Sequence, residues 1–184
     1  YIRVICGEFM RIASHLMAIG TFGLDVGAVT PFLWAFRDRE RILDLFEWIS
    51  GARLLYNYIW IGGLSRDMPS GWLKKASEFL DEFERNMKEF NRLLTGNHIF
   101  VKRTVDVGIL PPEVAINCGA TGPMLRGSGI KWDVRKDEPY SLYPHFEFDV
   151  PVGEGLFGPI GSVYDRYSVR VREIEQSVRI LRQA

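Results

Sequence analysis

The first part of the chain carries apolar residues at the spacing of a helix. The positions that repeat every three or four residues are Ile5, Phe9, Ile12, Leu16 and Ile19. Residues three to four apart lie on one face of a helix. The pattern therefore predicts a helix over residues 2–24, packed against neighbours on more than one side.

A second helix is expected over residues 31–48. Thr30 is a favourable N-cap residue, and Pro31 suits the first helical position because its missing N–H is not needed there. Ser50 and Gly51 follow the last periodic residues and predict the end of the helix. The first half of the chain is thus expected to contain two long helices.

The stretch that follows, residues 52–68, has no clear period. It contains the aromatic residues Tyr56, Tyr58 and Trp60. We expect irregular or short-helical structure here, with aromatic rings that need buried positions.

The clearest amphipathic pattern starts at Ser70 and ends at Gly96 and Asn97. Charged residues such as Lys74 and Glu82 lie on the face opposite the apolar stripe. The stripe consists of Trp72, Phe79, Phe83, Met87, Phe90 and Leu94. A third helix with one buried face is predicted.

Beyond residue 97 the patterns become shorter. We expect a strand over 104–110, a short helix opened by Pro111 and Pro112, and strand or extended structure over 130–152. A last helix is expected over 162–184. Its inward residues are Val169, Ile174, Val178 and Leu181. The chain is predicted to be one mainly α domain, residues 1–184, with a small β or extended insert.

The charge balance limits the classes of partner. Lys and Arg number 23, and Asp and Glu also number 23, so the net charge is zero. Nucleic acids and acidic membranes bind proteins through an excess of cations, so the composition offers no argument for either. No apolar run reaches the roughly 18–20 residues of a membrane-spanning helix. Aromatic residues make up 13% of the chain, a proportion that favours an interface in addition to a core.

The sequence gives no support for a metal site or for a hydrolytic active site. Cys6 and Cys118 are too few for a disulfide framework or a structural metal site. His15 lies among apolar residues and is expected to be a core or interface histidine. His98 and His145 have no nucleophile motif beside them. We therefore expect neither a metal ion nor a cofactor bound by this chain alone.

Asp25 is the most informative ionisable residue, because it ends one apolar helix and precedes another. A buried carboxylate is costly unless it is paired or hydrogen-bonded, and such groups often belong to functional sites. Asp25 is either a local cap or turn former, or an acid in a proton relay or ligand site. The sequence leaves both interpretations open.

Two further patterns have simpler interpretations. The glycine-rich residues 119–129 match neither common phosphate-binding pattern, and Arg126 within them is expected to bridge to a carboxylate. Residues 37–41 alternate in charge and indicate a solvated helix face with a pair between Arg37 and Glu40. The same residues could instead hold the helix against a partner.

Several long segments together resemble a known family. They include YIRVICGEFMRIASHLMAIGTFGLDVGAVTPF (1–32), AFRDRERILDLFEWISGAR (35–53), VGILPPEVA (107–115), ATGPMLRGSGIKWDVRKDEPY (120–140) and VYDRYSVRVREIEQSVRIL (163–181). In this order, and over essentially the whole chain, they resemble the large quinone-site subunit of the proton-pumping NADH-quinone oxidoreductase, respiratory complex I. The resemblance implies a helical bundle like that of nickel-iron hydrogenase large subunits, and an internal fragment of the family's full-length protein.

The resemblance also implies a role in quinone reduction. In this family a cavity for the quinone, ubiquinone for example, lies between the large quinone-site subunit and the neighbouring subunit that holds the terminal iron-sulfur cluster. Asp25 matches the acid that hydrogen-bonds a histidine at the quinone head, Thr21 matches a position that lines the cavity, and Phe32 matches its apolar wall. Asp25 is thus expected to be buried at one end of a slot and to act as the catalytic acid.

The implied setting is a multi-subunit enzyme. The expected partners are the iron-sulfur subunit, other peripheral-arm subunits and the membrane-arm subunit at the quinone site. The expected location is peripheral, on the cytoplasmic side of the bacterial inner membrane. The isolated chain, with only part of the cavity, is expected to be inactive as an NADH dehydrogenase and translocase.

One position departs from the family pattern. Leu55 stands where many members have a histidine linked to protonation near the cluster, and leucine cannot titrate. This leaves open a related complex that takes electrons from ferredoxin or another donor. A helical scaffold without a ligand site is the alternative from a different class.

Overall fold

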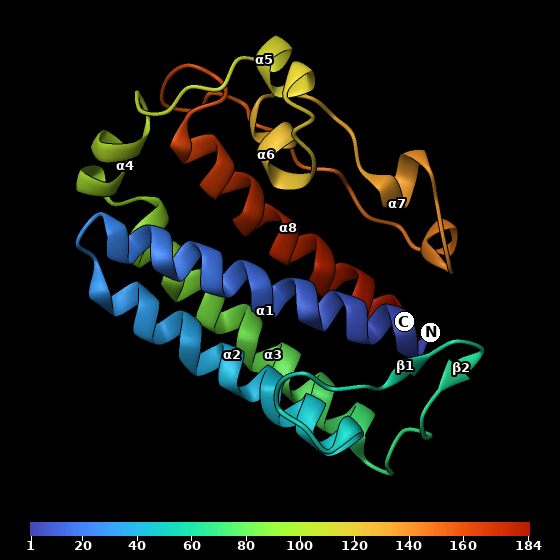
Figure 1. Ribbon diagram of the computed structural model, residues 1–184. Coiled ribbons are helices and arrows are strands. Elements are labelled where there is room, and N and C mark those ends of the chain that lie inside the picture. The colour runs from blue at the N-terminus through green and yellow to red at the C-terminus, as the bar shows by residue number, and fades with distance from the viewer.

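The structure is a computed structural model that describes residues 1–184. Its centre is α1 (Ile2–Asp25), which packs against α2 (Val29–Ser50) on one side and α8 (Val163–Gln183) on another. α2 in turn packs against α3 (Trp72–Phe90). Figure 1 shows these four long helices running roughly along one direction, with α5, α6 and α7 on the side of α8 and the β1–β2 hairpin near the N-terminus. The prediction of a mainly α fold with a small β insert is confirmed.

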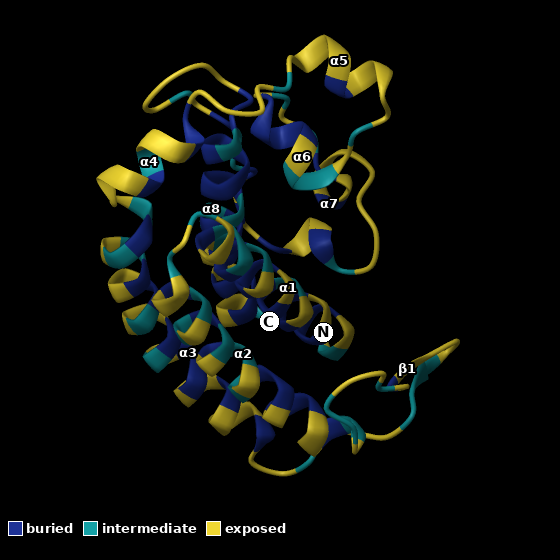
Figure 2. Cartoon of the chain, turned by 60° about the vertical axis from the view of Figure 1, so that its left-hand side comes forward, coloured by how far each residue is buried: buried dark blue, intermediate teal, exposed yellow.

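The central place of α1 explains its sequence. Ile12, Leu16 and Ile19 are fully buried, and they belong to a core of residues from all four long helices. At Gly20 an added Cβ would lie 3.2 Å from the Cβ of Ala35, so α1 and α2 approach closely at this point. Buried residues line the facing sides of the long helices (Figure 2). The prediction that α1 packs on more than one side is confirmed.

The boundary of α2 differs from the prediction. The N-cap residue is Ala28, and Thr30 lies inside the first turn. Gly27 adopts a φ of 90° and reverses the chain, while the N–H of Ala28 already donates to the carbonyl of Gly23 at 2.7 Å. Because this turn is so tight, the helix begins before Thr30.

The third helix carries its apolar stripe as predicted. Trp72, Phe83 and Leu94 are nearly inaccessible to solvent. α3 starts after Gly71 and not at Ser70, and its last turn widens into the π-helix η1 (Asn91–Thr95). The widened turn still directs Leu94 inward, toward Gly23 of α1.

The remaining elements are short. Residues 52–68 contain no helix; they form mostly irregular structure and one antiparallel hairpin, in which Ile59 pairs with Leu64. Tyr58 is buried and Tyr56 stacks on Phe46, but Trp60 is exposed. The short elements are β1 (Ile59–Trp60), β2 (Gly63–Leu64), α4 (His98–Thr104), α5 (Pro112–Asn117), α6 (Gly122–Gly127), α7 (Val134–Asp137) and the 3-10 helix η2 (Tyr143–His145).

The predicted strand over 104–110 is wrong. α4 extends through Thr104, and only Val107 and Leu110 form backbone hydrogen bonds with the segment before α8. Gly108, with a φ of 60°, lies between them and interrupts any ladder. The short helix after Pro111 is confirmed as α5.

The prediction of strand or extended structure over 130–152 is only partly right: the short helices α7 and η2 occupy part of this range, and residues 146–150 are extended but form no strand. Phe146, Phe148 and Val150 are buried, and the residues between them are exposed. The backbone N–H groups of residues 147 and 149 donate to the side chains of Gln183 and Gln176. Side chains of α8 therefore replace the neighbouring strand that a sheet would supply.

The last helix is confirmed. α8 has Ser162 as its N-cap, and Val169, Ile174, Val178 and Leu181 are buried. None of the helices has both the length and the apolar content that crossing a lipid bilayer requires.

Candidate functional site

The three predicted site residues lie together at the turn between α1 and α2. Thr21 is half-buried, and its hydroxyl donates to the carbonyls of Met17 and Ala18 in its own helix. Asp25 is the last residue of α1. Phe32 is half-buried in the first turns of α2, with its ring centre 4.3 Å from that of Phe36. The fold thus brings these residues to one end of the α1–α2 hairpin.

Asp25 itself is exposed, so the expectation of a buried acid is wrong for this chain. No other part of residues 1–184 buries its side chain. The carboxylate forms no hydrogen bond or ion pair, and the C-cap residue is Val26. Asp25 is therefore not a local cap either, and its oxygens are free to accept hydrogen bonds from another molecule.

Three exposed aliphatic residues lie near Asp25 in the same hairpin. Leu24, Val29 and Leu33 expose 41%, 53% and 60% of their surface. Exposed apolar residues often mark sites for ligands or partners when they gather in one region of a surface, and here they accompany a carboxylate without a partner in the chain. We call Thr21, Asp25 and Phe32, with these three aliphatic residues, the hairpin tip.

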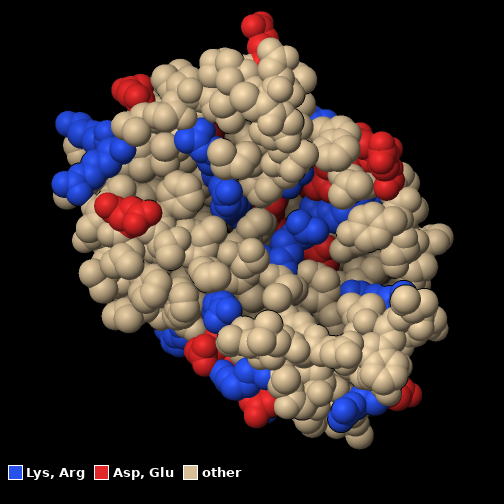
Figure 3. Space-filling view, viewed as in Figure 1, with Lys and Arg blue, Asp and Glu red and all other residues tan.

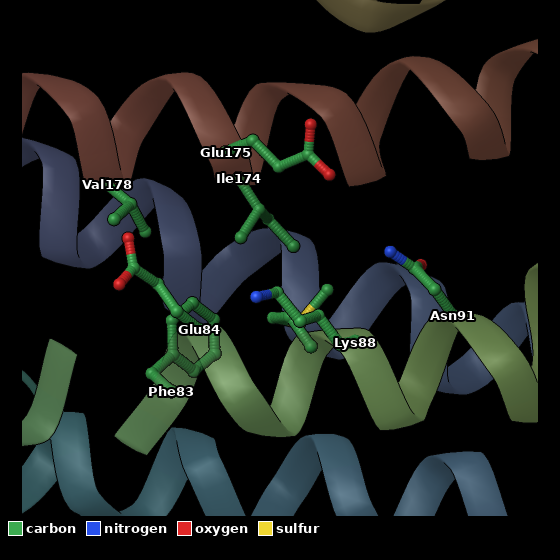
Figure 4. A pocket seen from close by; sticks show the side chains of 8 residues that line it. Phe83, Glu84, Lys88, Asn91, Ile174, Glu175 and Val178 are labelled. Atoms are coloured by element: carbon green, nitrogen blue, oxygen red, sulfur yellow. The ribbon is translucent and has the colours of Figure 1, made fainter. Parts of the chain in front are cut away.

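Two hollows of the surface lie elsewhere. One of about 340 Å³ opens between α3 and α8, where Phe83 and Lys88 face Ile174 and Val178 (Figure 4). A second of about 300 Å³ lies farther along the same helices, beside Trp72. Neither is lined by a residue of the hairpin tip.

Sequence reasoning missed most of a second polar feature, a group of six buried ionisable side chains that we call the buried ionic cluster. It joins α1, α8 and the segment from α6 to α7. On the face shown in Figure 3, basic and acidic side chains adjoin one another in a hollow near the middle of the molecule. The members of the cluster are Glu8, His15, Arg126, Asp133, Arg135 and Glu173.

Glu173 is the centre of one half of the cluster. His15 Nε2 lies 2.7 Å from one carboxylate oxygen, and Arg126 Nε donates to the other at 2.6 Å. Arg126 also donates to the carbonyl of Trp132. The predictions that His15 is a core histidine and that Arg126 bridges to a carboxylate are both confirmed.

Glu8 is the centre of the other half. Arg135 Nη1 donates to Glu8 Oε1 at 3.1 Å, and the hydroxyls of Tyr143 and Ser177 donate to the same carboxylate at 2.6 and 2.7 Å. Arg135 also forms a two-pronged pair with Asp133. Asp133 Oδ2 lies 3.7 Å from Arg126 Nη1, so the two halves form one connected network.

The cluster keeps its carboxylates ionised. Burial alone would raise the pKa of Glu173, but the hydrogen bond from His15 and the charge of Arg126 hold it below its usual value. Burial would also raise the pKa of Glu8, but Arg11, Arg135 and two hydroxyl donors together lower it. For His15, burial lowers the pKa and outweighs the attraction of Glu173. The histidine is neutral at pH 7 and donates to Glu173.

These shifts give stability a defined pH dependence. All three groups have a lower pKa when folded, so the unfolded chain binds more protons in acid and stability rises with pH. The contribution of His15 is present above pH 6.5 and is lost as the pH falls below that value. The contributions of Glu8 and Glu173 are present above pH 4.5 and are lost below it.

We expect the wild-type chain to begin losing stability near pH 6.5, and His15→Gln to keep a flat profile down to the carboxylate range. Urea unfolding at a series of pH values measures this. His98→Gln, which changes an exposed histidine, is the matched control and should follow the wild type. Identical profiles for all three proteins would contradict the assignment.

Neither cysteine nor histidine assembles a metal site. No three His, Cys, Asp or Glu side chains converge on a common point. Cys6 is buried, and burial raises the pKa of its thiol to about 11. Cys118 is exposed and unpaired.

The charged face of α2 differs in detail from the prediction. Arg37 pairs with Asp38 and not with Glu40. Glu40 instead pairs at 2.5 Å with Arg53, which also reaches Asp44 and Glu47. Arg53 therefore fastens the segment after α2 to the helix.

Leu55 lies two residues after Arg53, fully exposed and with a φ of 55°. A leucine rarely adopts this left-handed conformation. The side chain therefore projects from a fixed bend with no contact that shields it from solvent.

Comparison with known proteins matches the chain to one family. Residues 25–184 fit the model of the family described as "Respiratory-chain NADH dehydrogenase, 49 Kd subunit". This match begins at Asp25 and includes every element of the structure after α1. The chain belongs to this family.

Individual relatives agree over the full length of the chain. The D-type subunit of the NADH-quinone oxidoreductase of Chlorobaculum tepidum is 57% identical over 183 residues, which is 100% of this chain and 46% of that protein. The same protein of Chlorobium luteolum is 57% identical with the same coverage. Its counterpart in Cytophaga hutchinsonii is 52% identical and 47% covered. The chain spans about half the length of the curated relatives it matches.

Proposed function

We propose that the hairpin tip forms one wall of a quinone-reduction cavity in an NADH-quinone oxidoreductase. The observation that carries the proposal is the free carboxylate of Asp25 in a hairpin that also exposes Leu24, Val29 and Leu33. A quinone consists of a polar head that must be protonated on reduction and an apolar ring and tail. An apolar slot with few, well-placed polar groups suits such a ligand.

The residues of the tip have distinct roles in this proposal. Asp25 accepts a hydrogen bond from the proton donor at the quinone head and fixes its orientation. Thr21 lies one turn before Asp25 on the same helix and lines the cavity. Phe32 supplies apolar wall from α2. The exposure of Asp25 in this chain fits a cavity that is completed by polypeptide beyond residues 1–184.

The proposal includes the setting of the enzyme. Electrons reach the quinone from an iron-sulfur cluster held by a neighbouring subunit, and a membrane-arm subunit closes the cavity from the other side. This subunit lies peripherally on the cytoplasmic side of the bacterial inner membrane, in an enzyme that couples quinone reduction to proton pumping. The family relationship to NADH-quinone oxidoreductase subunits favours NADH as donor over ferredoxin.

Asp25→Asn in the assembled enzyme tests the proposal. We expect quinone reduction to fall by about 10- to 100-fold, because an amide orients a proton donor poorly and cannot compensate its charge. NADH oxidation with ferricyanide, a water-soluble acceptor that needs no quinone cavity, should stay within about twofold. Both activities are measured on the same membranes.

Asp67→Asn is the matched control, since Asp67 is an exposed acid in the loop after the β-hairpin. It should leave both activities unchanged. Normal quinone reduction by Asp25→Asn would sink the site assignment. Loss of both quinone and ferricyanide reduction in Asp25→Asn would also count against it, because Asp25 would then be needed for assembly of the enzyme and not specifically for quinone reduction.

A further inference from the structure

The turn between α1 and α2 lacks a capping side chain of its own. The C-cap residue of α1 is Val26 and the N-cap residue of α2 is Ala28, and neither has a polar side chain. α1 has no basic residue in its last turn, and α2 has no acidic residue in its first. Within the hairpin the turn is closed only by backbone hydrogen bonds, from the N–H of Gly27 to the carbonyl of Leu24 and from the N–H of Ala28 to the carbonyl of Gly23.

One side chain from a distant part of the chain supports this turn. Arg103 Nη1 donates to the carbonyl oxygen of Val26 at 2.6 Å, across 77 residues of sequence. The last carbonyls of a helix lack intrahelical donors and carry partial negative charge, so a guanidinium there both satisfies an acceptor and interacts favourably with the helix dipole. Arg103 forms no ion pair with a carboxylate.

The helix that carries Arg103, α4, is anchored by packing, while the Arg103 side chain itself is exposed. Phe100 is buried against Tyr167 of α8, with ring centres 4.7 Å apart. Thr104 is buried on the same helix, and Asn97 caps its first turn by accepting from two backbone N–H groups. Arg103 thus reaches the turn from an anchored helix and not from a loose loop.

The position of the contact bears directly on the candidate site. Val26 follows Asp25, and the next residue, Gly27, adopts a φ of 90°. A Cβ added at Gly27 would lie 3.7 Å from Arg103 Nη1, so the guanidinium lies against the turn itself. Without it, the end of α1 keeps only its backbone hydrogen bonds and can fray. Fraying would move the Asp25 carboxylate relative to the rest of the hairpin tip.

We propose that Arg103 is a positioning residue for the quinone site, which acts by holding the Val26 carbonyl and thereby fixing the direction of Asp25. This inference rests on the proposed function of the hairpin tip. Arg103 touches neither the quinone nor the proton that is transferred. Its effect passes through Asp25, and this dependence distinguishes it from a residue that merely stabilises the fold.

A double-mutant cycle in the assembled enzyme measures that dependence. Arg103→Ala is expected to lower kcat/KM for the quinone about tenfold, a loss typical of one hydrogen bond with a charged donor. In an Asp25→Asn background the same change should cost less than about twofold. Arg103→Lys keeps a charged donor and should recover most of the activity. Lys102→Ala, which changes the adjacent exposed residue of α4, is the matched control and should behave as wild type.

The possible outcomes distinguish the positioning role of Arg103 from the proposed function of the hairpin tip. An equal loss from Arg103→Ala in both backgrounds, or no difference between Arg103→Ala and Lys102→Ala, overturns the positioning role. If Asp25→Asn impairs quinone reduction and Arg103→Ala does not, only the positioning role fails. If Asp25→Asn leaves quinone reduction normal, the proposed function fails and this inference with it. Ferricyanide activity within about twofold of wild type in every variant shows that a loss concerns the quinone site.

Discussion

Glu173→Ala is expected to lower the free energy of unfolding by about 3–5 kcal/mol. The substitution leaves the Arg126 guanidinium buried without its closest carboxylate and removes the acceptor of His15. The charge of Asp133, 3.7 Å from Arg126, replaces only part of the lost interaction. A buried cation without a close counter-ion destabilises the fold, because no attractive interaction offsets the hydration free energy that the cation loses on burial.

Urea unfolding at pH 7 of the 184-residue chain measures the loss. Glu173→Gln keeps the volume and one acceptor but not the charge, so it separates electrostatics from packing and should lose most of the same stability. Glu175 lies two residues away on α8, is exposed and forms no ion pair. Glu175→Ala is therefore the matched control and should change the free energy of unfolding by less than about 0.5 kcal/mol. A Glu173→Ala protein as stable as Glu175→Ala would refute the cluster's structural role.

Gly153→Ala is expected to destabilise the chain by about 3 kcal/mol, although it adds a single methyl group. An added Cβ would lie 2.1 Å from the carbonyl oxygen of Gly127, far inside van der Waals contact. The backbone cannot yield easily, because the N–H of Gly153 donates to the carbonyl of Arg126 at 2.8 Å. The Cβ of Asp165 restricts the other side at 3.1 Å.

Gly96→Ala is the matched control for this effect. Gly96 follows η1 with a φ of −89° and has no atom within 4 Å of an added Cβ. Alanine there should be neutral or slightly stabilising, since it reduces the freedom of the unfolded chain. Thermal unfolding of both variants checks the difference. Equal melting temperatures would show that the segment before α8 can move away from α6.

Much of the helical framework could be predicted from local pattern. The stripe from Trp72 to Leu94 predicts a helix because six large apolar residues recur on one face, and all six are buried. The alternation around Phe148 correctly predicts extended backbone. It does not reveal what the backbone pairs with, and the structure uses glutamine side chains of α8 in place of a strand.

The candidate site, too, could be predicted from the sequence only in part. Proximity of Thr21, Asp25 and Phe32 follows from their places at the end of one predicted helix and the start of the next. The exposure of Asp25 does not follow, because apolar neighbours in sequence do not reveal whether another element covers a residue. No sequence pattern pointed to the contact of Arg103, since its partner is a backbone carbonyl 77 residues away.

The sequence by itself determined the long helices, their inward faces, the role of Arg126 and the family of the chain. These depend on residue spacing and identity, which are local. Only the tertiary structure decided which charges meet inside the protein. Glu8 and Arg135 are 127 residues apart, and a buried ion pair forms where packing brings two groups together, whatever their separation along the chain.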